Sequence, residues 1–281
     1  MTDRTVAQYV AIEPQPGSGI IHPFPTPDIP HLDPFVFLDT GAPSQLGTGS
    51  IHVAPHPHRG VQPVSLVFRA EIEHRDSLGN HVTVSSGGMQ WLVAGSGALH
   101  EEVLRGDAEG VFHMAQLWVN VHSEDKMSPP RHHAVAADDV PVLDLADGAS
   151  VRLFAGELAG AAGPAPLGTP VLIAHVALDA GAEVRIPAPR GWTTAVCVVA
   201  GEVGTGERDG LVPGATAVLA DDGDAVAIRS TDGGEALFLA GQPIGEPIVM
   251  GGGFVVTDDR ALAEAFADLE AGLFGELEAS R

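Results

Sequence analysis

Two histidines in the segment 55-PHPHRG-60 have a type and spacing that suggest metal chemistry. Successive side chains of a β-strand point to opposite faces, so His56 and His58 are predicted to share one face, while Pro57 points to the other. Because Pro57 cannot donate a ladder hydrogen bond, this strand is predicted to lie at a sheet edge or to contain a bulge. The two imidazoles would then point to the same side of the strand, where they could bind one ion.

A second pair with the same spacing follows in 95-GSGALHEEV-103. His100 and Glu102 are predicted to share a face, with Glu101 pointing away. If the two pairs lie on neighbouring strands of a barrel, they converge. Three imidazoles and one carboxylate suit Fe(II), Mn(II), Ni(II) or Cu(II), whereas zinc usually prefers four tetrahedral ligands. A six-coordinate metal held this way keeps two positions for substrate or O₂. On spacing alone, four unrelated polar residues remain the alternative.

The remaining polar candidates are given smaller roles. Gln62 follows the parity of His56 and His58, so it is predicted either to face the same cavity as a hydrogen-bonding neighbour of the metal or to be satisfied by backbone. Cys197 lies in an apolar strand and is interpreted as a small core residue. The other ten histidines are not expected to bind metal. They are His22, His31, His52, His74, His81, His113, His122, His132, His133 and His175.

Short apolar runs separated by turns predict an all-β fold. Glycine (35) and proline (22) are frequent enough to supply those turns. Strands are predicted at residues 64–68, 70–75, 81–85, 90–95 and 116–121, and again at 151–156, 170–178, 182–187, 194–203, 215–220, 224–230 and 236–241. The stretch 128-SPPRHHAVAADDVP-141 is interpreted as a connector. The two similar series of strands suggest an internal duplication.

One helix is predicted near the end of the chain, at about residues 258–271. Thr257 or Asp258 can cap it and Gly272 can stop it. Apolar side chains recur at helical spacing and are predicted to pack on the core. They are Leu262, Phe266, Leu269 and Leu273.

The amino-acid composition limits which classes of partner this chain is expected to bind. The chain of 281 residues carries a formal charge of −23, with 37 acidic residues against 14 basic ones. Such a surface repels phosphates, so direct nucleic-acid binding is not expected. The start of the chain does not resemble a signal peptide, and no apolar run has membrane-spanning length, so no membrane partner is expected. With one cysteine and therefore no internal disulfide, a cytoplasmic location is the expectation.

Several segments resemble the pirin family, and the similarity spans nearly the whole chain. They are 29-IPHLDPFVFLD-39, 56-HPHRG-60, 73-EHRDSLGN-80, 89-MQWLVAGSGALHEE-102, 116-QLWVN-120, 240-AGQPIGEPIV-249 and 264-EAFADLEAGLFG-275. The resemblance implies two cupin-type β-barrels facing each other (a bicupin) with a short C-terminal helix. It implies an N-terminal cupin domain with the metal site at residues 1–135, and a C-terminal cupin domain without a complete site at residues 136–281, ending in the helix.

Carried over by motif, the resemblance implies His56, His58, His100 and Glu102 as ligands of one metal ion. The ion is expected to be Fe(II), with Mn, Ni, Co, Cu or Zn as alternatives. Some pirins resemble quercetin 2,3-dioxygenases, which open a flavonol ring with O₂. Others act as metal- or redox-sensing regulators through protein partners. An aromatic small-molecule substrate and a protein partner are therefore the two alternatives.

One departure from the family bears on the chemistry. Many pirins carry Glu where this chain has Gln62, and a neutral amide is a poor base. Glu102 is then expected to act as both ligand and catalytic base, unless the flavonol arrives already ionised.

Overall fold

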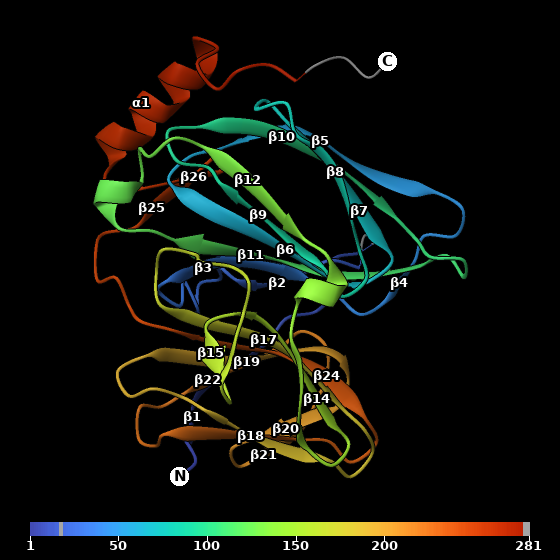
Figure 1. The fold of residues 1–281 in the computed structure, drawn as a ribbon. Coiled ribbons are helices and arrows are strands. Elements are labelled where there is room, and N and C mark those ends of the chain that lie inside the picture. The colour runs from blue at the N-terminus through green and yellow to red at the C-terminus, as the bar shows by residue number, and fades with distance from the viewer. Residues whose placement is uncertain (17–18, 278–281) are drawn as a thin grey trace. The chain divides into compact units, whose positions relative to one another are not determined.

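The computed structural model describes residues 1–16 and 19–277, and β-strands dominate it (Figure 1). The described chain divides into two compact units. We call the unit made of Ser44–Ala137 and the chain from Ile244 onward the N-terminal barrel. The unit made of Met1–Pro43 and Asp138–Pro243 is the C-terminal barrel. The all-β expectation is confirmed.

The N-terminal barrel contains two antiparallel sheets. The larger has the strand order β12–β9–β6–β11, with β4 also pairing with β11, and the smaller has the order β5–β10–β7–β8. The bounds are β4 Ser44–Gln45, β5 Ser50–His58, β6 Val61–Arg69, β7 Glu71–Asp76, β8 His81–Ser85, β9 Met89–Val93, β10 Ala98–Arg105, β11 Val111–Asn120 and β12 Arg131–Val135. A short 3₁₀ helix spans Ser123–Asp125, a second spans Ala137–Asp139, and the hairpin β25 Val249–Gly251 and β26 Phe254–Val256 belongs to the later segment.

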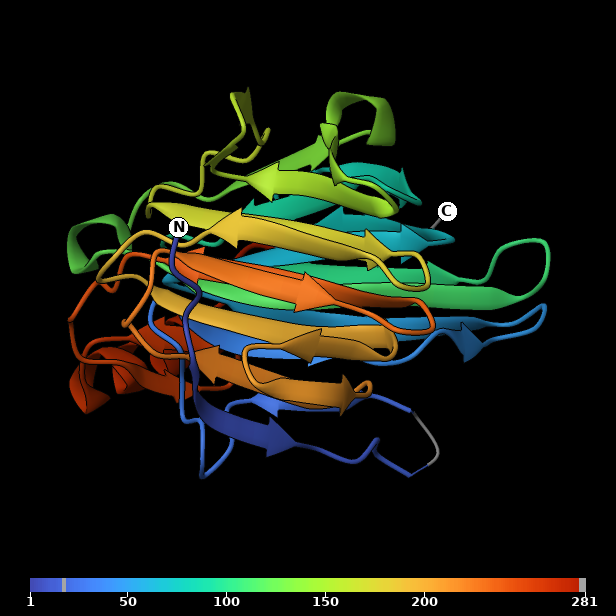
Figure 2. The same ribbon diagram turned by 90° about the horizontal axis from the view of Figure 1, so that it is seen from below.

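The C-terminal barrel also contains two main sheets. The larger has the order β1–β22–β19–β24–β17–β14–β13, and Figure 2 shows these strands side by side with dark-blue β1 at one edge. The smaller has the order β18–β23–β20–β21. Two short antiparallel pairs, β2–β3 and β15–β16, complete the unit. The bounds are β1 Val6–Ala11, β2 Ile21–Phe24, β3 Phe35–Thr40, β13 Val142–Ala146, β14 Ala149–Ala155, β15 Glu157–Leu158, β16 Ala161–Ala162, β17 Val171–Leu178, β18 Glu183–Pro187, β19 Thr193–Gly201, β20 Val203–Thr205, β21 Arg208–Leu211, β22 Ala215–Leu219, β23 Ala225–Arg229 and β24 Gly234–Gly241.

The strand orders bear out the suggested internal duplication. The series β5 to β11 and the series β18 to β24 pair in the same way, giving β5–β10–β7–β8 beside β9–β6–β11 in one barrel and β18–β23–β20–β21 beside β22–β19–β24 in the other. The junction after β6 and the junction after β19 each place one residue in the left-handed region, Ala70 at φ 75° and Gly201 at φ 61°. The two halves therefore share a topology even where their side chains differ.

The unit boundaries differ from two consecutive domains divided after residue 135. The border at Ala137/Asp138 lies close to that point, but the first 43 residues belong with the second half, and the chain from Ile244 belongs with the first. The stretch at 128–141, predicted as a connector, contains strand β12, which pairs with β9. The stretch does contain the border between the two units, but its Pro- and Asp-rich flanks hid a five-residue strand.

Helix α1, Asp259–Glu270, forms where it was predicted. The Asp258 side chain accepts a hydrogen bond from the Ala261 N–H at its start, and Gly272 follows its end at φ 75°. The helix lies beside β25 and β26 (Figure 1). The apolar stripe is only partly buried, since Phe266 is 41% exposed and Leu273 68% exposed. No helix in the described part of the chain is long and apolar enough to cross a membrane.

The interiors of the two barrels differ. In the C-terminal barrel, buried aliphatic side chains from both sheets make one large cluster, which includes Val184, Ile186, Val226 and Ile228. In the N-terminal barrel, Val67, Ile72, Val84 and Phe112 belong to a smaller apolar cluster. The buried residues of the same strands also include polar ones, among them Ser65 on β6 and His74 and Asp76 on β7.

Candidate metal centre

Three of the four predicted ligands come together inside the N-terminal barrel. Strand β5 pairs with β10 in an antiparallel register that places His56 opposite His100. The rings of His56, His58 and His100 have centroids 4.3–5.0 Å apart, and one nitrogen from each lies within 4.8 Å of the others. Strand β5 lies at the edge of its sheet, and its pairing with β10 is bulged, as Pro57 predicted. The two-residue spacing thus produces the expected convergence of imidazoles.

Each of these rings is held through its Nδ1 atom. His56 Nδ1 lies 2.9 Å from the Ala54 carbonyl, and His58 Nδ1 lies 3.0 Å from the Gly253 carbonyl. A carbonyl only accepts, so both rings carry their proton on Nδ1 and leave a lone pair on Nε2. His100 Nδ1 faces His74 Nδ1 at 3.3 Å.

The Nε2 atoms of His58 and His100 are buried and have no hydrogen-bond partner in the described structure. Two buried nitrogens without partners, beside a third imidazole, fit a divalent metal ion.

The environment keeps the rings of His58 and His100 neutral. Burial, followed by the charge of neighbouring His56, lowers the pKa of His58 to about 3. Burial also lowers the pKa of His100 well below its ordinary value, and the neighbouring histidines, His58 first, act in the same direction. A neutral imidazole offers a lone pair, whereas an imidazolium does not. At neutral pH both rings are therefore in the form that a metal requires.

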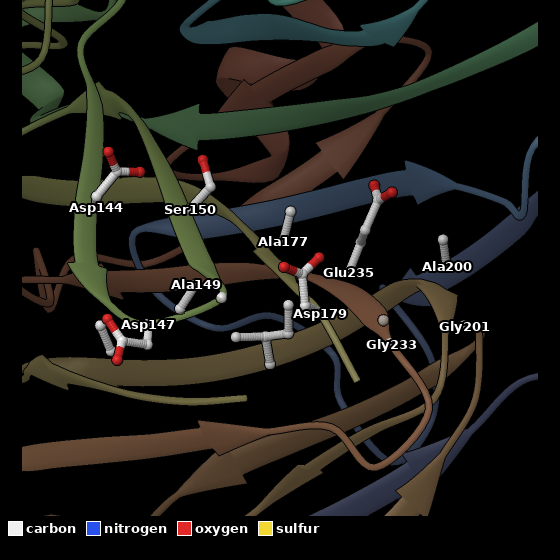
Figure 3. Close-up of a pocket in the computed structure, with 14 residues that line it drawn as sticks. Asp144, Asp147, Ala149, Ser150, Ala177, Asp179, Ala200, Gly201, Gly233 and Glu235 are labelled. Carbon is white, nitrogen blue, oxygen red and sulfur yellow. The ribbon is translucent and has the colours of Figure 1, made fainter. Parts of the chain in front are cut away.

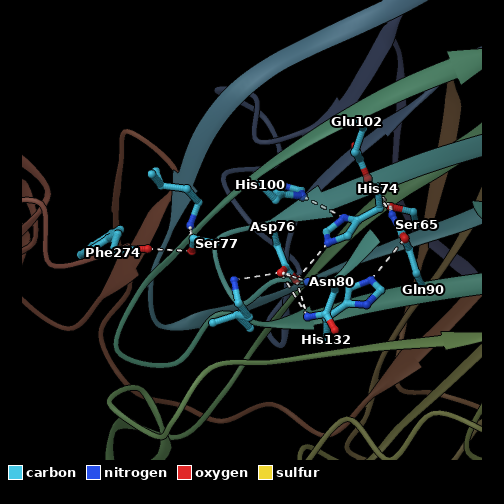
Figure 4. A network of polar contacts seen from close by, with 12 residues as sticks. Ser65, His74, Asp76, Ser77, Asn80, Gln90, His100, Glu102, His132 and Phe274 are labelled. Carbon is cyan, nitrogen blue, oxygen red and sulfur yellow. Dashed lines mark hydrogen bonds and ion pairs between the residues drawn. The ribbon is translucent and has the colours of Figure 1, made fainter. Parts of the chain in front are cut away.

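Glu102 lies beside this triad and accepts hydrogen bonds from uncharged side chains. Ser65, Gln90 and Gln116 come from the adjacent strands β6, β9 and β11 in register and donate to the carboxylate at 3.2, 2.8 and 3.3 Å. Figure 4 shows Ser65 and Gln90 near Glu102. A carboxylate oxygen of Glu102 and one ring nitrogen each of His74 and His100 lie within 4.8 Å of one another. Glu102 does not form such a group with all of His56, His58 and His100. A carboxylate oxygen has more than one lone pair, so these hydrogen bonds leave it able to bind a metal as well.

Three further residues surround His100, and their arrangement was missed from the sequence. His74 and Asp76 on β7 and His132 on β12 bring their ligand atoms within 4.8 Å of one another (Figure 4). The His74 and His132 rings stack at a centroid distance of 4.0 Å and an angle of 14°. The segment 73-EHRDSLGN-80 carries the signal, since His74 and Asp76 are a third same-face pair with two-residue spacing. The connector interpretation of residues 128–141 hid His132.

The first alternative for Gln62, that it faces the same cavity as His56 and His58, is wrong. Ser65 on β6 faces Glu102, and Gln62 lies three residues earlier on the same strand, so it points to the opposite face. The parity from His58 does not continue, because Gly60 adopts a left-handed φ of 70° between β5 and β6. Gln62 is therefore not a neighbour of the histidine cluster.

The chain after Ile244 contacts the segment at residues 56–60, which carries His56 and His58. Arg59, next to His58, donates to the Ser96 carbonyl and to Asp268 of α1, both at 2.8 Å, and its guanidinium lies 4.7 Å from the Phe274 ring centroid. Lys126, the only lysine in the chain, is buried and donates to the Gly60 carbonyl at 2.9 Å and to the Val255 carbonyl at 3.2 Å. These contacts fix the 56–60 segment from both sides.

The C-terminal barrel has a cavity of another kind. It measures about 650 Å³ and is lined by small side chains together with Asp144, Asp147, Asp179 and Glu235 (Figure 3). Glu235 contacts His175 at 2.8 Å. Among the described residues, the three groups of side chains close enough to share one metal ion all lie in the N-terminal barrel.

Comparison with known proteins places this architecture. The pirin family profile matches residues 17–119, and the profile of the pirin C-terminal cupin domain matches residues 173–275. The chain belongs to the pirin family. Its fold is the pirin bicupin.

Three similar proteins extend this result. A Pseudomonas aeruginosa protein provisionally named as a quercetin 2,3-dioxygenase is 36% identical over 251 residues, which cover 87% of each chain. A crystal structure titled quercetin 2,3-dioxygenase from Acinetobacter baumannii is 32% identical, with a TM-score of 0.90 over 98% of this pirin and 99% of that chain. A bacterial pirin from Escherichia coli, solved with nickel(II), is 17% identical, with a TM-score of 0.62 over 84% of this chain and 100% of that one, and shares the fold.

Proposed function

We propose that this pirin is a metal-dependent dioxygenase of the quercetin 2,3-dioxygenase type, acting on a flavonol or a similar aromatic substrate. The metal is Fe(II), bound by His56, His58, His100 and Glu102. The observation that carries the proposal is the set of three imidazoles tied through Nδ1, with the Nε2 atoms of His58 and His100 buried and without partners. The 32% identity and TM-score of 0.90 to the Acinetobacter baumannii quercetin 2,3-dioxygenase support the reaction class.

A divalent metal such as Fe(II) would supply Lewis acidity and redox chemistry at this set of side chains. The residues of the chain would supply the rest. The three imidazoles would bind the metal through Nε2, and Glu102 would be the fourth ligand and the base that accepts the proton of the flavonol 3-hydroxyl group. Ser65, Gln90 and Gln116 hold that carboxylate in place with neutral donors. The alternative, in which the flavonol arrives already ionised, removes the need for a base.

The first test is metal content. Elemental analysis of freshly purified protein should give close to one metal ion per chain, and the His58→Ala variant should retain little. His52→Ala is a matched control, because His52 lies on the same strand but is exposed and contacts Glu101 outside the cluster. It should keep the wild-type metal content. Equal metal content in all three proteins would contradict the proposed ligands.

The second test is oxygen uptake with quercetin after anaerobic loading with Fe(II). Wild-type protein and His52→Ala should consume oxygen, whereas His58→Ala should not. Glu102→Gln should lose turnover with a neutral flavonol and recover part of it at a pH where the substrate is ionised. Absence of turnover with Fe, Mn, Ni, Co and Cu would rule out the dioxygenase and leave a metal-sensing protein that acts through partners.

A further inference from the structure

We propose that Asp76 and His74 are positioning residues that fix the tautomer of His100 and thereby aim its Nε2 lone pair at the metal. The inference rests on the proposed metal binding by His100 and deepens it. It concerns a chain of three side chains, Asp76–His74–His100, that is drawn with dashed lines in Figure 4.

This series of three side chains begins at the carboxylate of Asp76, which can only accept a hydrogen bond. The Asp76 Oδ2 atom lies 3.2 Å from His74 Nε2. An ionised carboxylate has no proton to donate, so His74 carries its proton on Nε2. Burial acts to raise the pKa of Asp76, but hydrogen bonds from His74 and Asn80 outweigh it and leave that pKa below its ordinary value. Asp76 is therefore ionised at neutral pH.

The second step follows from the first. When its single ring proton is on Nε2, His74 has a lone pair on Nδ1, and this atom faces His100 Nδ1 at 3.3 Å. One member of such a pair must donate, so His100 carries its proton on Nδ1. Its Nε2 atom is then deprotonated, and it is this atom that is buried without a partner. Asp76 thus sets, through His74, the tautomer of His100 that a metal needs.

This arrangement differs from that of the other two histidines. His56 and His58 face backbone carbonyls, which can hold only one tautomer. His100 faces a side chain that can either donate or accept, so its tautomer depends on Asp76. Outer partners of this kind orient metal-binding histidines in many proteins.

Asp76 is itself held in one orientation. Its Oδ1 atom accepts hydrogen bonds from the Leu78 N–H and the Asn80 N–H, each at 2.9 Å, and from Asn80 Nδ2 at 3.1 Å. Oδ2 accepts from Asn80 Nδ2 at 2.8 Å and is left to face His74. His132 stacks on His74 and fixes the plane of its ring. The geometry therefore leaves little freedom for an alternative network.

The same residues could instead bind a second metal ion, because His74, Asp76 and His132 are close enough to share one. The contacts favour the positioning role. Both nitrogens of His74 are engaged, both oxygens of Asp76 accept hydrogen bonds, and His132 Nε2 lies 3.3 Å from Gln90 Oε1. A second ion is an outcome that the experiment below detects.

The decisive variant is Asp76→Asn. Three donors converge on the Oδ1 position, so the amide oxygen takes that place and the NH₂ group faces His74 Nε2. His74 must then carry its proton on Nδ1 and donate it to His100 Nδ1, which moves the His100 proton to Nε2. Two-bond ¹H–¹⁵N correlation spectra of the metal-free protein should show His100 as the Nδ1–H tautomer in wild type and the Nε2–H tautomer in Asp76→Asn.

The second readout is affinity for Co(II), followed by its absorption spectrum under anaerobic conditions. Asp76→Asn and His74→Phe should each bind Co(II) about 10- to 100-fold more weakly than wild type. His74→Phe keeps an aromatic ring against His132 and tests the relay if Asp76→Asn does not fold. Asn80→Ala is the control for the turn, because it removes the Asn80 side-chain bonds but leaves the contact between Asp76 and His74. It should lower the melting temperature while keeping the wild-type tautomer and affinity.

The outcomes are distinct. The inference is overturned if Asp76→Asn keeps the Nδ1–H tautomer of His100 with wild-type Co(II) affinity. It is also overturned if wild type binds two Co(II) ions and His132→Phe, which preserves the stack, binds only one. If wild type binds no Co(II), the proposed function fails, while the tautomer shift in the metal-free protein still decides whether the relay exists.

Discussion

The two barrels of this pirin have the same strand order but different interiors. On β5 and β10 of the N-terminal barrel, the registered pairs that face inward are His56 with His100 and His58 with Ala98. On the corresponding strands β18 and β23 of the C-terminal barrel, the registered inward pairs are Val184 with Ile228 and Ile186 with Val226. One topology therefore supports either a polar site or an aliphatic core.

The difference extends to the residues that support the ligands. In the N-terminal barrel, Ser65, Gln90 and Gln116 line the strands behind Glu102. The inward residues of the corresponding strands β19 and β22 include Val196, Val198, Ala215 and Ala217, which belong to the aliphatic cluster. The proposed ligands and the hydrogen bonds that support them thus occur in the same barrel, since a buried imidazole without partners is costly.

The largest expected effect, on metal affinity, comes from replacing His56 and His100 with the residue types of Val184 and Ile228, which lie opposite each other in the C-terminal barrel. The double variant His56→Val/His100→Ile should reduce metal affinity more than about 1,000-fold, because two of three imidazole ligands are lost. The metal-free protein should stay folded, with its unfolding free energy changed by less than about 2 kcal/mol, because apolar groups replace buried polar ones. Calorimetric metal titration and urea unfolding measure the two effects. Retained tight binding would show that the triad is not the site.

The reciprocal change should damage the C-terminal barrel. Val184→His/Ile228→His places two imidazoles, at the registered pair that corresponds to His56 and His100, in the aliphatic cluster. Loss of apolar packing and burial of unpaired nitrogens should together destabilise the protein by roughly 3–6 kcal/mol. Urea unfolding with and without Co(II) measures the cost. A stable variant that gains a second Co(II) ion would show that the supporting contacts are dispensable.

A smaller effect should appear on mild acidification of the metal-free protein. Burial lowers the pKa of both His58 and His132 to about 3 and that of His100 well below 6.5. Below about pH 6.5 the unfolded chain takes up protons that these folded rings do not, so stability falls as pH decreases, by about 1 kcal/mol per pH unit for each ring.

Asp39 acts in the opposite direction. Burial raises the pKa of Asp39 to about 6, so the folded state binds that proton more readily than the unfolded chain does. The stability gained at Asp39 on acidification offsets the stability lost at one of the histidine rings. Urea unfolding at about pH 7 and about pH 5, a range above most ordinary carboxylate pKa values, should therefore show a net loss of stability at the lower pH. Equal stability at both values would contradict neutral, buried rings in the N-terminal barrel.

The fold and the core of the site were predictable for local reasons. Alternation along a strand was enough to place His56 with His58 and His100 with Glu102, and repeated short strands with turn residues indicated the all-β architecture. The helix was bounded correctly because Asp258 and Gly272 are strong capping and stopping residues.

The rest depends on distant or irregular contacts. The carbonyl that holds His58 comes from Gly253, 195 residues later in the chain, and no local pattern indicates that distance. Gln62 was misplaced because a left-handed glycine, Gly60, interrupts the alternation. His132 was missed because its short strand lies among prolines and aspartates. The make-up of the two compact units also could not be read from chain order, because the first 43 residues belong with the second half and the chain from Ile244 belongs with the first.

The most direct measurement of the central claim is anomalous diffraction from crystals of the metal-loaded protein, recorded at the absorption edge of the bound metal. The account predicts one anomalous peak per chain, bonded to the Nε2 atoms of His56, His58 and His100 and to a carboxylate oxygen of Glu102. A peak among His74, Asp76 and His132, a peak in the C-terminal barrel, or coordination through Nδ1 would contradict it.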